Sequence, residues 1–472
     1  MKLNNNIQIA LIAMGLAGMV SCNKIKDFGD TNVNPAAITS PTTYAILTTV
    51  ESGISGWAKD GAATAWIQYG SESQYPAEGI YDVTSTYYGF GTYTGSLLNL
   101  RTIISKNNNP DEVAAARVLT QYIYWHITDA LGDIPYSQAF NSKTPAYDKQ
   151  EDIYKGMIAE LKAAKNQFAN TGGLKGDILN NNNVSLWIKF ANSLRAMMAI
   201  QLTKKYPGTN DYAATEFRAA IADGVITSNA DNIKLAFPGG DYKNPYYNDN
   251  YSARDNGLST TVYNLLNSWG DGRQAAFGTS NVPVPFGLKE ANINAWIKNN
   301  PSWSHFLAAA NRTETSPVYL LTASELYIAR AEAAVRGWTS EDKNAMLQAG
   351  VNASFAQWNL AAPSASYFAQ SALTLDGTSG DLKKVAEQAY IAAFPDGAAG
   401  WNIWRRTGFP VLTNAPEPLT VAHSTIPRRY TFIPATVSTF SEYSLNPTNV
   451  AAAVSRLAPA QDQPESKIWW DQ

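Results

Sequence analysis

The chain has 472 residues, which is enough for one large domain or for two to three ordinary ones. Its 36 basic and 39 acidic residues nearly balance, and this excludes the strongly basic face that nucleic-acid binding normally needs. Aromatic residues make up 11% of the chain and Tyr is the most frequent of them. Such a composition is typical of surfaces that bind by stacking while remaining hydrated, or of a Tyr-rich core in a large helical protein.

The N-terminus predicts an export signal that ends in lipid attachment. Residues 7–20 are apolar but too few to span a bilayer as a helix. The tripeptide Met-Val-Ser then precedes Cys22 in an order that resembles a bacterial lipobox. Cys22 is the only cysteine, so an internal disulfide is impossible, and a lipid thioether there would anchor the chain firmly. The alternative is an unmodified buried cysteine. We predict a signal peptide at residues 1–21, a lipidated tether at 22–41 and a single domain at 42–472.

The first dense group of aromatic residues lies between residues 57 and 93. Its central part, SESQYPAEGIYDVTSTYY at 71–88, has neither a helical nor an alternating period, which predicts an exposed loop. Exposed rings beside amide and carboxylate groups suit carbohydrate, because the rings pack on the C–H faces of a sugar while the polar groups bind its hydroxyls. The alternative is a loop whose rings fold back over the core. The candidate ligand-binding residues here are Gln74, Tyr75, Tyr81, Asp82, Tyr87 and Tyr88.

Strong helical periodicity follows. Residues 111–131, DEVAAARVLTQYIYWHITDAL, carry two acids in the first turn, where they favour the helix dipole. Further helices are predicted at residues 43–58, 62–70, 150–169, 184–206, 211–223, 341–359 and 382–393.

Two more segments are predicted to be loops that contribute to a ligand site. Residues 238–257, PGGDYKNPYYNDNYSARDNG, are aperiodic and rich in Tyr, and they offer Asn250 and Arg254 for hydrogen bonds. Residues 281–306, NVPVPFGLKEANINAWIKNNPSWSHF, offer Trp296 and Trp303 as stacking rings.

An amphipathic helix is predicted at residues 321–338, LTASELYIARAEAAVRGW. Thr322 followed three residues later by Glu325 is typical of a capping box, and Gly337 is a natural stop. Glu325 and Glu332 are seven residues apart, so they share one face of this helix.

These two acids have two interpretations. They form either a general acid/base pair in a cleft or structural ion pairs with Arg405 and Arg406 of the segment WNIWRRTGFP. We favour the structural interpretation, in which a buried pair specifies the geometry of packing more than it adds stability.

Several of these segments, in order along the chain, resemble the SusD/RagB family of outer-membrane nutrient-binding lipoproteins of the Bacteroidetes type. The resemblance covers about residues 29–471. Two positions depart from the family pattern, with Ile433 in place of Tyr and Val437 in place of Glu. The segments that carry it are ALGDIPYSQAF, WIKFANSLRAMMAIQL, LTASELYIARAEAAVRGW, QAYIAAFPDGAAGWNIWRRTGFPVL, IPRRYTFIPATV and SKIWWD.

The resemblance implies a mostly α SusD-like fold, a tetratricopeptide-like scaffold of helix pairs with long loops and little β-structure. The predicted pairs 111–131/150–169 and 184–206/211–223 fit such a scaffold. It further implies a non-catalytic cell-surface lipoprotein of the outer membrane that faces the exterior. Such a protein binds a nutrient glycan and passes it to a SusC-like TonB-dependent transporter. The alternative ligand is a peptide, as in the RagB-like members.

The sequence contains no recognised catalytic motif. There is no GxSxG, HExxH or GxxxxGK[ST], and three scattered histidines do not assemble into a metal site by spacing. We therefore predict neither a cofactor nor a metal. The enzymatic alternative is an α/α-barrel glycoside hydrolase, which would need two carboxylates about 5–10 Å apart. Glu78 and Asp82 are the candidates for that pair.

Overall fold

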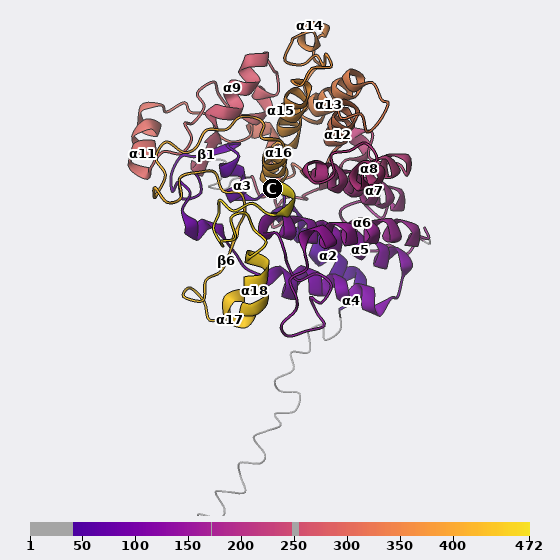
Figure 1. Ribbon diagram of the computed structural model, residues 1–472. Helices are drawn as coiled ribbons and strands as arrows, with labels where there is room; N and C mark the ends of the chain where they lie inside the picture. Colours follow the sequence, from indigo (N-terminus) through magenta and orange to yellow (C-terminus); the bar gives the residue numbers. More distant parts are fainter. Residues whose placement is uncertain (1–40, 171, 248–253) are drawn as a thin grey trace, which may run out of the picture. The chain divides into compact units, whose positions relative to one another are not determined.

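The computed structural model of the protein describes residues 41–170, 172–247 and 254–472. It is mostly helical, with 51% of residues in helices and 7% in strands, which confirms the predicted fold class. Residues 43–472 form one compact unit, in which long helices lie side by side on the right of Figure 1 and shorter elements and loops lie on the left.

The helices of the described residues are α2 (Thr43–Gly53), α3 (Gly61–Trp66), α4 (Leu98–Lys106), α5 (Pro110–Leu131), α6 (Gln150–Gln167), α7 (Val184–Gln201), α8 (Tyr212–Ala222), α9 (Thr260–Trp269), α10 (Gln274–Phe277), α11 (Glu290–Asn299), α12 (Ala323–Val335), α13 (Lys343–Gln357), α14 (Ala365–Phe368), α15 (Asp381–Ala393), α16 (Gly397–Thr407), α17 (Glu442–Leu445) and α18 (Pro447–Val454). The strands are β1 (Gly70–Glu72), β2 (Tyr87–Tyr88), β3 (Ile233–Leu235), β4 (Asn256–Leu258), β5 (Val318–Leu321) and β6 (Thr431–Phe432).

Helices that follow one another along the chain pack as pairs. Helix α5 packs on α6, α7 on α8, α12 on α13 and α15 on α16, while α6 also contacts α7 and α12 contacts α15. The succession of pairs matches the helix-pair scaffold expected from the sequence. One prediction was wrong, since residues 281–306 contain helix α11 as well as loops.

Local sequence signals set where these helices begin. The Asn109 side chain accepts hydrogen bonds from the N–H groups of Asp111 and Glu112, and Pro110 takes the first helical position of α5. At α12 the predicted capping box is present. The Glu325 N–H donates to Thr322 Oγ1 at 3.3 Å, and the Thr322 N–H donates to Glu325 Oε2 at 2.9 Å.

A small residue lets α12 and α13 approach each other closely. A Cβ atom added at Gly350 of α13 would lie 2.5 Å from Ile328 Cγ1 and 3.1 Å from the Ser324 carbonyl oxygen, both on α12. The Ser324 hydroxyl donates to the Gly350 carbonyl at 2.8 Å, so the close approach also satisfies a buried polar group.

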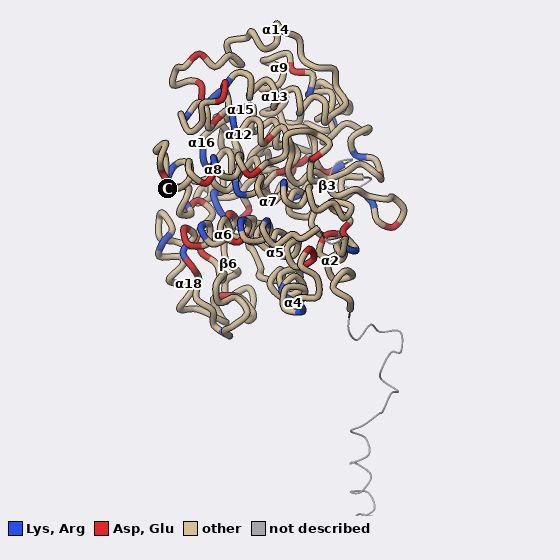
Figure 2. The backbone as a smooth tube through the Cα atoms, turned by 90° about the vertical axis from the view of Figure 1, so that its right-hand side faces the viewer, with Lys and Arg blue, Asp and Glu red and all other residues tan. Residues whose placement is uncertain are grey.

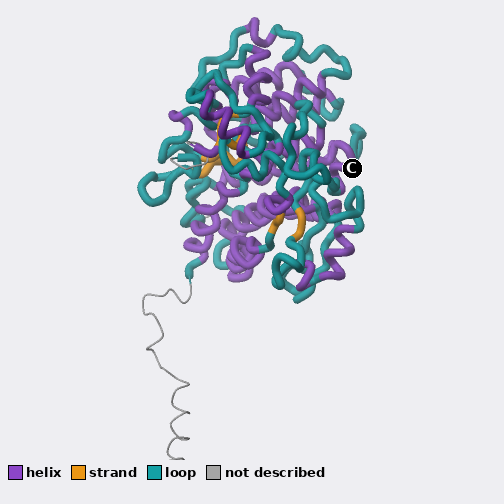
Figure 3. The backbone as a smooth tube through the Cα atoms, turned by 90° about the vertical axis from the view of Figure 1, so that its left-hand side faces the viewer, coloured by secondary structure: helices purple, strands orange, loops and turns teal. Residues whose placement is uncertain are grey.

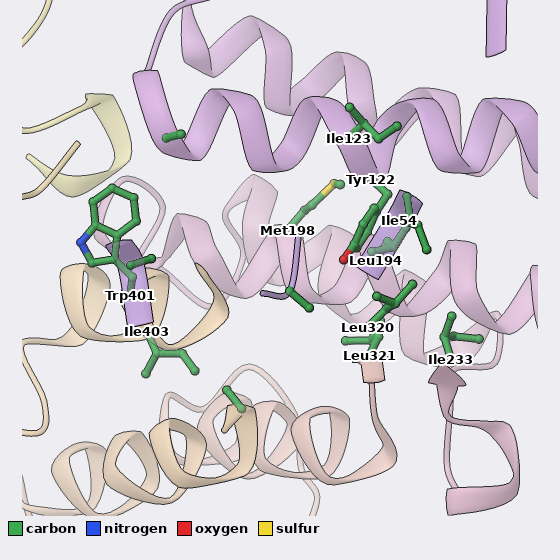
Figure 4. Close-up of a cluster of buried hydrophobic side chains, with 14 of the residues drawn as sticks. Ile54, Tyr122, Ile123, Leu194, Met198, Ile233, Leu320, Leu321, Trp401 and Ile403 are labelled. Atoms are coloured by element: carbon green, nitrogen blue, oxygen red, sulfur yellow. The ribbon is translucent and has the colours of Figure 1, made fainter. Parts of the chain in front are cut away.

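The core is a continuous apolar cluster to which distant parts of the chain contribute. Figure 4 shows side chains of α5, α7, β5 and α16 converging on it, among them Ile123, Leu194, Leu320 and Ile403. Charged residues of both signs are mixed along the chain rather than gathered on one face (Figure 2). Four arginines are fully buried: Arg195, Arg273, Arg405 and Arg429.

Within the described ranges, no helix combines the length and the apolarity needed to cross a membrane.

Candidate functional site

Strands β1 and β4 bring two of the predicted ligand loops together. They pair antiparallel, with Gly70 opposite Leu258 and Glu72 opposite Asn256. One residue beyond β1, the Ser73 N–H donates to the Asp255 carbonyl at 2.7 Å. The first aromatic loop therefore starts where the second aromatic segment ends. Figure 3 shows this side of the molecule as loops around short strands.

The third predicted segment reaches the same strand. The Leu258 N–H donates to the Ser304 carbonyl at 2.9 Å, and Gly257 forms a β-bridge with His305. Glycine is required at position 257, because a Cβ atom there would lie 2.7 Å from the Ser304 carbonyl oxygen. All three predicted segments thus meet at β4, although Ser73 of the first and Ser304 of the third are 231 residues apart along the chain.

A cleft of about 250 Å³ lies at this junction. The Tyr75 side chain, 64% exposed, stands at the cleft, and its φ of +55° places it in a left-handed backbone conformation. The Gln74 amide donates to Asp255 Oδ1, and Arg254 Nε donates to the same oxygen at 2.8 Å. The exposed ring of Tyr75 therefore lies beside the side chains of Gln74, Arg254 and Asp255, which hydrogen bonds hold in position. The cleft is lined by Gly61, Glu72, Gln74, Tyr75, Glu78, Asp255 and Asn256.

Two carboxyl groups of the cleft interact. Burial raises the pKa of Glu72 well above its usual value, and the neighbouring Glu78, which shares a hydrogen bond with it, raises this pKa further. The Gly79 N–H donates to Glu72 Oε2 at 2.7 Å and opposes the shift. The raised pKa favours the protonated form of Glu72, in which a carboxyl group can donate as well as accept a hydrogen bond.

Comparisons with known proteins identify the family. A family model described as "Starch-binding associating with outer membrane" matches residues 29–433. The chain belongs to the SusD-like family. This SusD-like protein is accordingly a nutrient-binding protein associated with the outer membrane, in a family of binding proteins rather than enzymes. The glycoside-hydrolase alternative is therefore wrong. No curated protein matches the chain.

Solved structures show the same fold. A SusD homologue from Bacteroides fragilis is 21% identical, with a TM-score of 0.79 over 92% of this chain and 100% of that chain. A SusD homologue from Bacteroides uniformis is 22% identical, with a TM-score of 0.78 and the same coverage. A SusD homologue from Flavobacterium johnsoniae, described as chitin-binding, is 24% identical, with a TM-score of 0.76 over 91% of this chain and 98% of that chain.

Two predicted stacking rings of the SusD-like protein are not exposed. Tyr81 is 2% exposed, and its hydroxyl oxygen accepts a hydrogen bond from the Ala415 N–H at 3.0 Å. Trp303 is 9% exposed and packs with Val284 and Ile293. The expectation of free rings at these positions was wrong, because each ring covers a part of the core that other segments of the chain build.

Trp296 is half-buried and packs against the same small cluster as Trp303. Ile293, Trp296 and Ile297 have the i, i+3, i+4 spacing of an amphipathic helix, which is the signal that would have revealed α11. The polar residues around them had favoured a loop.

The remaining predicted ligand residues lie elsewhere. Tyr87 and Tyr88 form β2, which pairs parallel with β6, and Tyr88 lines a separate cavity. The Asp82 carboxylate caps a short 3₁₀ turn, where the Thr84 N–H donates to it at 2.9 Å. Asn250 and the predicted lipidation site Cys22 lie outside the described residues.

The four predicted structural residues separate into different contacts. Arg406 donates to both carboxylate oxygens of Glu332, with 2.7 Å between Nη2 and Oε2. Burial alone would raise the pKa of Glu332, but Arg406 and Arg336 beside it hold the pKa at about 2. Glu325 pairs with neither arginine, since its carboxylate stays in the capping box of α12.

Arg405 was expected to pair with one of the two glutamates, and that expectation was wrong. Its Nη1 donates to the backbone carbonyls of Asp129 at 2.7 Å and Arg428 at 2.8 Å. The guanidinium lies between the rings of Trp401 and Trp470, 3.5 Å and 4.6 Å from their centroids. Arg405 therefore joins α16 to the end of α5 and to the C-terminal segment.

Sequence reasoning did not find Glu72 or Asp255 as site residues. Asp255 adjoins Arg254, so an alternation of charge was visible, but nothing in the sequence places residue 255 beside residue 74. That neighbourhood arises from the pairing of β1 with β4.

Proposed function

We propose that this SusD-like protein binds a nutrient glycan in the cleft beside Tyr75 and passes it to a SusC-like TonB-dependent transporter. The observation that carries the proposal is the exposed Tyr75 ring at the edge of a cleft lined by amide and carboxyl groups. A flat ring packs on the C–H face of a sugar, while neighbouring polar groups bind its hydroxyls. The starch-binding description of the family and the chitin-binding homologue from Flavobacterium johnsoniae support a glycan ligand.

The polar groups of the cleft support the same ligand class. Gln74 and Arg254 both donate to Asp255, so these three side chains hold one another in position before a ligand arrives. Pre-positioned hydrogen-bonding groups reduce the entropy that is lost on binding. The Arg254 side chain remains 56% exposed, which leaves donors available to a ligand.

A lipid anchor completes the proposal. A thioether-linked lipid at Cys22 would hold the protein at the outer membrane on the exterior side, next to its transporter. Several acyl chains are enough for firm attachment.

Calorimetry of residues 23–472 tests the proposal against starch-derived oligosaccharides, chitin-derived oligosaccharides and oligopeptides. The decisive variant is Tyr75→Asn, because asparagine tolerates the left-handed backbone at this position while it removes the ring. We expect binding of one glycan to weaken at least about tenfold in this variant. The matched control is Tyr44→Asn, which removes a ring that is 45% exposed on α2, outside the cleft.

Two outcomes would overturn the proposal. Binding of oligopeptides alone would favour a peptide-capturing protein. Glycan binding that survives unchanged in Tyr75→Asn would place the site away from this cleft.

A further inference from the structure

Three large apolar side chains are exposed within nine residues near the C-terminus. Phe440 is 83% exposed, and Val437 and Leu445 on either side of it are exposed as well. Charges are almost absent around them, because residues 430–455 contain a single charged side chain, Glu442, which is buried. An exposed apolar surface without charges between its members usually marks a place that a partner covers.

A groove of about 460 Å³ opens beside two of these side chains. Phe440 and Leu445 line it together with Phe90, Pro135 and Tyr147, which come from the first third of the chain. The Phe90 and Tyr147 rings pack on each other, with 6.0 Å between their centroids. A groove of this volume with a mainly apolar lining can take up part of an acyl chain.

Helix α4 extends the same surface. Thr94 lines the groove, the exposed Leu98 follows four residues later, and Arg101 follows after three more, so the three side chains share one helix face. The Arg101 guanidinium donates to the Phe140 carbonyl and to Asn141 Oδ1, each at 3.1 Å. Both acceptors are uncharged, so these contacts leave the positive charge of Arg101 without compensation.

The exposed charges at the edge of this surface are positive. Lys143, two residues beyond Asn141, is exposed and lines the groove. The carboxyl group in the lining belongs to Glu442, which is buried and accepts from the Ile433 N–H at 3.3 Å. An apolar surface edged by cations is complementary to the face of a membrane, where phosphate groups lie above the acyl chains.

This surface lies at the end of the domain where the predicted tether joins. Helix α4 packs on α2, and α2 begins at Thr43, 21 positions after Cys22. Figures 1 and 2 both show α2, α4 and α18 toward the lower end of the unit. A coil of about 20 residues spans roughly 25 Å, so a lipid at Cys22 would keep this end of the domain close to the bilayer.

We propose that this end of the domain rests on the lipid bilayer through six side chains: Leu98, Arg101, Lys143, Val437, Phe440 and Leu445. The apolar side chains enter the boundary between headgroups and acyl chains, and the two cations bind lipid phosphate groups. The inference rests on the proposed lipid anchor and goes beyond it. An anchor alone would leave the domain free to turn on its tether, whereas this contact fixes its orientation on the membrane.

The test uses residues 23–472, which contain no cysteine. A cysteine introduced by Phe440→Cys therefore takes an environment-sensitive NBD label at that position alone. An added N-terminal histidine tag holds the protein, through its own tether, on vesicles of phosphatidylcholine and phosphatidylglycerol in equal amounts with a nickel-chelating lipid. The tag replaces the lipid at Cys22, so the result does not depend on lipidation.

Val421→Cys is the matched control. Val421 is 91% exposed and apolar, so the label is as accessible there as at Phe440, and neither change removes a buried side chain. Its segment lies against the first aromatic loop, where the Leu419 N–H donates to the Ile80 carbonyl at 2.7 Å.

We expect the label at position 440 to emit at shorter wavelength on the vesicles and to be quenched by doxyl-labelled lipid. The label at position 421 should show neither change. Adding Lys143→Glu to Phe440→Cys should reduce the quenching, because repulsion from phosphate replaces attraction. Unchanged emission at position 440 would overturn the proposal and leave the surface for a protein partner. Equal quenching at both positions would overturn it as well, since the contact would then be non-specific. Palmitate incorporation at Cys22 is a separate result, so the anchor and this contact fail independently.

Discussion

Arg406 and Glu332 form a buried two-point ion pair that joins α16 to α12. Both guanidinium Nη atoms donate to the carboxylate, and the two residues are 5% and 3% exposed. Glu332 also accepts from Arg336 of its own helix, which is more exposed. Glu332 belongs to the helix pair α12–α13 and Arg406 to the helix pair α15–α16, and the two residues are 74 positions apart in the sequence. Their ion pair therefore fixes how the two helix pairs pack against each other.

Glu332→Gln should lower the free energy of unfolding by about 3–5 kcal/mol, because it leaves the Arg406 charge buried without a counter-charge. Urea denaturation monitored by tryptophan fluorescence measures this loss. Arg336→Ala is the control and should cost about 1 kcal/mol or less, since it removes the more exposed partner of the same carboxylate. If the two variants lost the same free energy of unfolding, the burial of the Arg406 charge would not be the cause of the loss in Glu332→Gln.

The same pair makes stability depend on acid pH. The pKa of Glu332 is about 2 in the folded protein against 4.5 for an unperturbed glutamate. The pKa of Glu332 is lower in the folded protein than in the unfolded chain, so the ionised side chain stabilises the folded protein. This stabilisation is complete above about pH 4.5 and disappears as the pH falls through about 2. Melting temperatures measured from neutral to acid pH should therefore fall less in Glu332→Gln than in the wild-type protein. Parallel curves for the two proteins would contradict this assignment.

Glu325 makes stability change with pH in the opposite direction to Glu332. Burial raises its pKa to about 7, although two hydrogen bonds from Thr322 lower it. The protonated Glu325 side chain contributes fully to the stability of the folded protein below about pH 4.5. This contribution is lost as the pH rises through about 7, because the buried carboxyl must then ionise.

Glu325→Gln should keep the capping box, which accepts either residue at this position. From pH 4 to pH 8, the free energy of unfolding of the variant should rise relative to that of the wild-type protein by up to about 3 kcal/mol. This value follows because one pKa unit corresponds to about 1.4 kcal/mol. Unfolding curves at both pH values check the difference. A variant that loses stability equally at both values would show that the carboxylate acts only as a cap.

The scaffold was predictable because its signals are local. Helix α5 shows its apolar period and its first-turn acids within 22 consecutive residues, and α12 shows its capping box within four. Strands of two to four residues carry no comparable period, and their pairing joins segments that are far apart in sequence. The meeting of Gln74 with Asp255 is a consequence of that pairing.

The candidate site was predictable only in part, for a related reason. Tyr75 and Tyr81 stand in the same aperiodic loop, yet one is 64% and the other 2% exposed. What buries Tyr81 is Phe286, whose ring centroid lies 6.4 Å away, and the backbone of Ala415. Both partners come from segments more than 200 residues later, so no local pattern distinguishes the two tyrosines.

Cys22→Ala should abolish lipid attachment. We expect the wild-type protein to take up labelled palmitate and to sediment with membranes, and the variant to do neither, because removal of the thiol removes the site of the thioether. Metabolic labelling followed by membrane fractionation measures both properties. Palmitate incorporation that persists in the variant would place the anchor at another residue.

Tyr81→Phe separates the stability of the loop from its ligand binding. The change removes the hydroxyl that accepts from the Ala415 N–H and leaves a buried amide without a partner, at a cost of about 1–3 kcal/mol. Tyr44→Phe is the control, and we expect it to change the free energy of unfolding by about 0.5 kcal/mol or less, because that side chain is 45% exposed. Glycan affinity measured by calorimetry should stay the same in both variants, since neither ring lines the cleft. A loss of affinity in Tyr81→Phe without a loss of stability would mean that this hydroxyl reaches the ligand, and that the loop rearranges when the ligand binds.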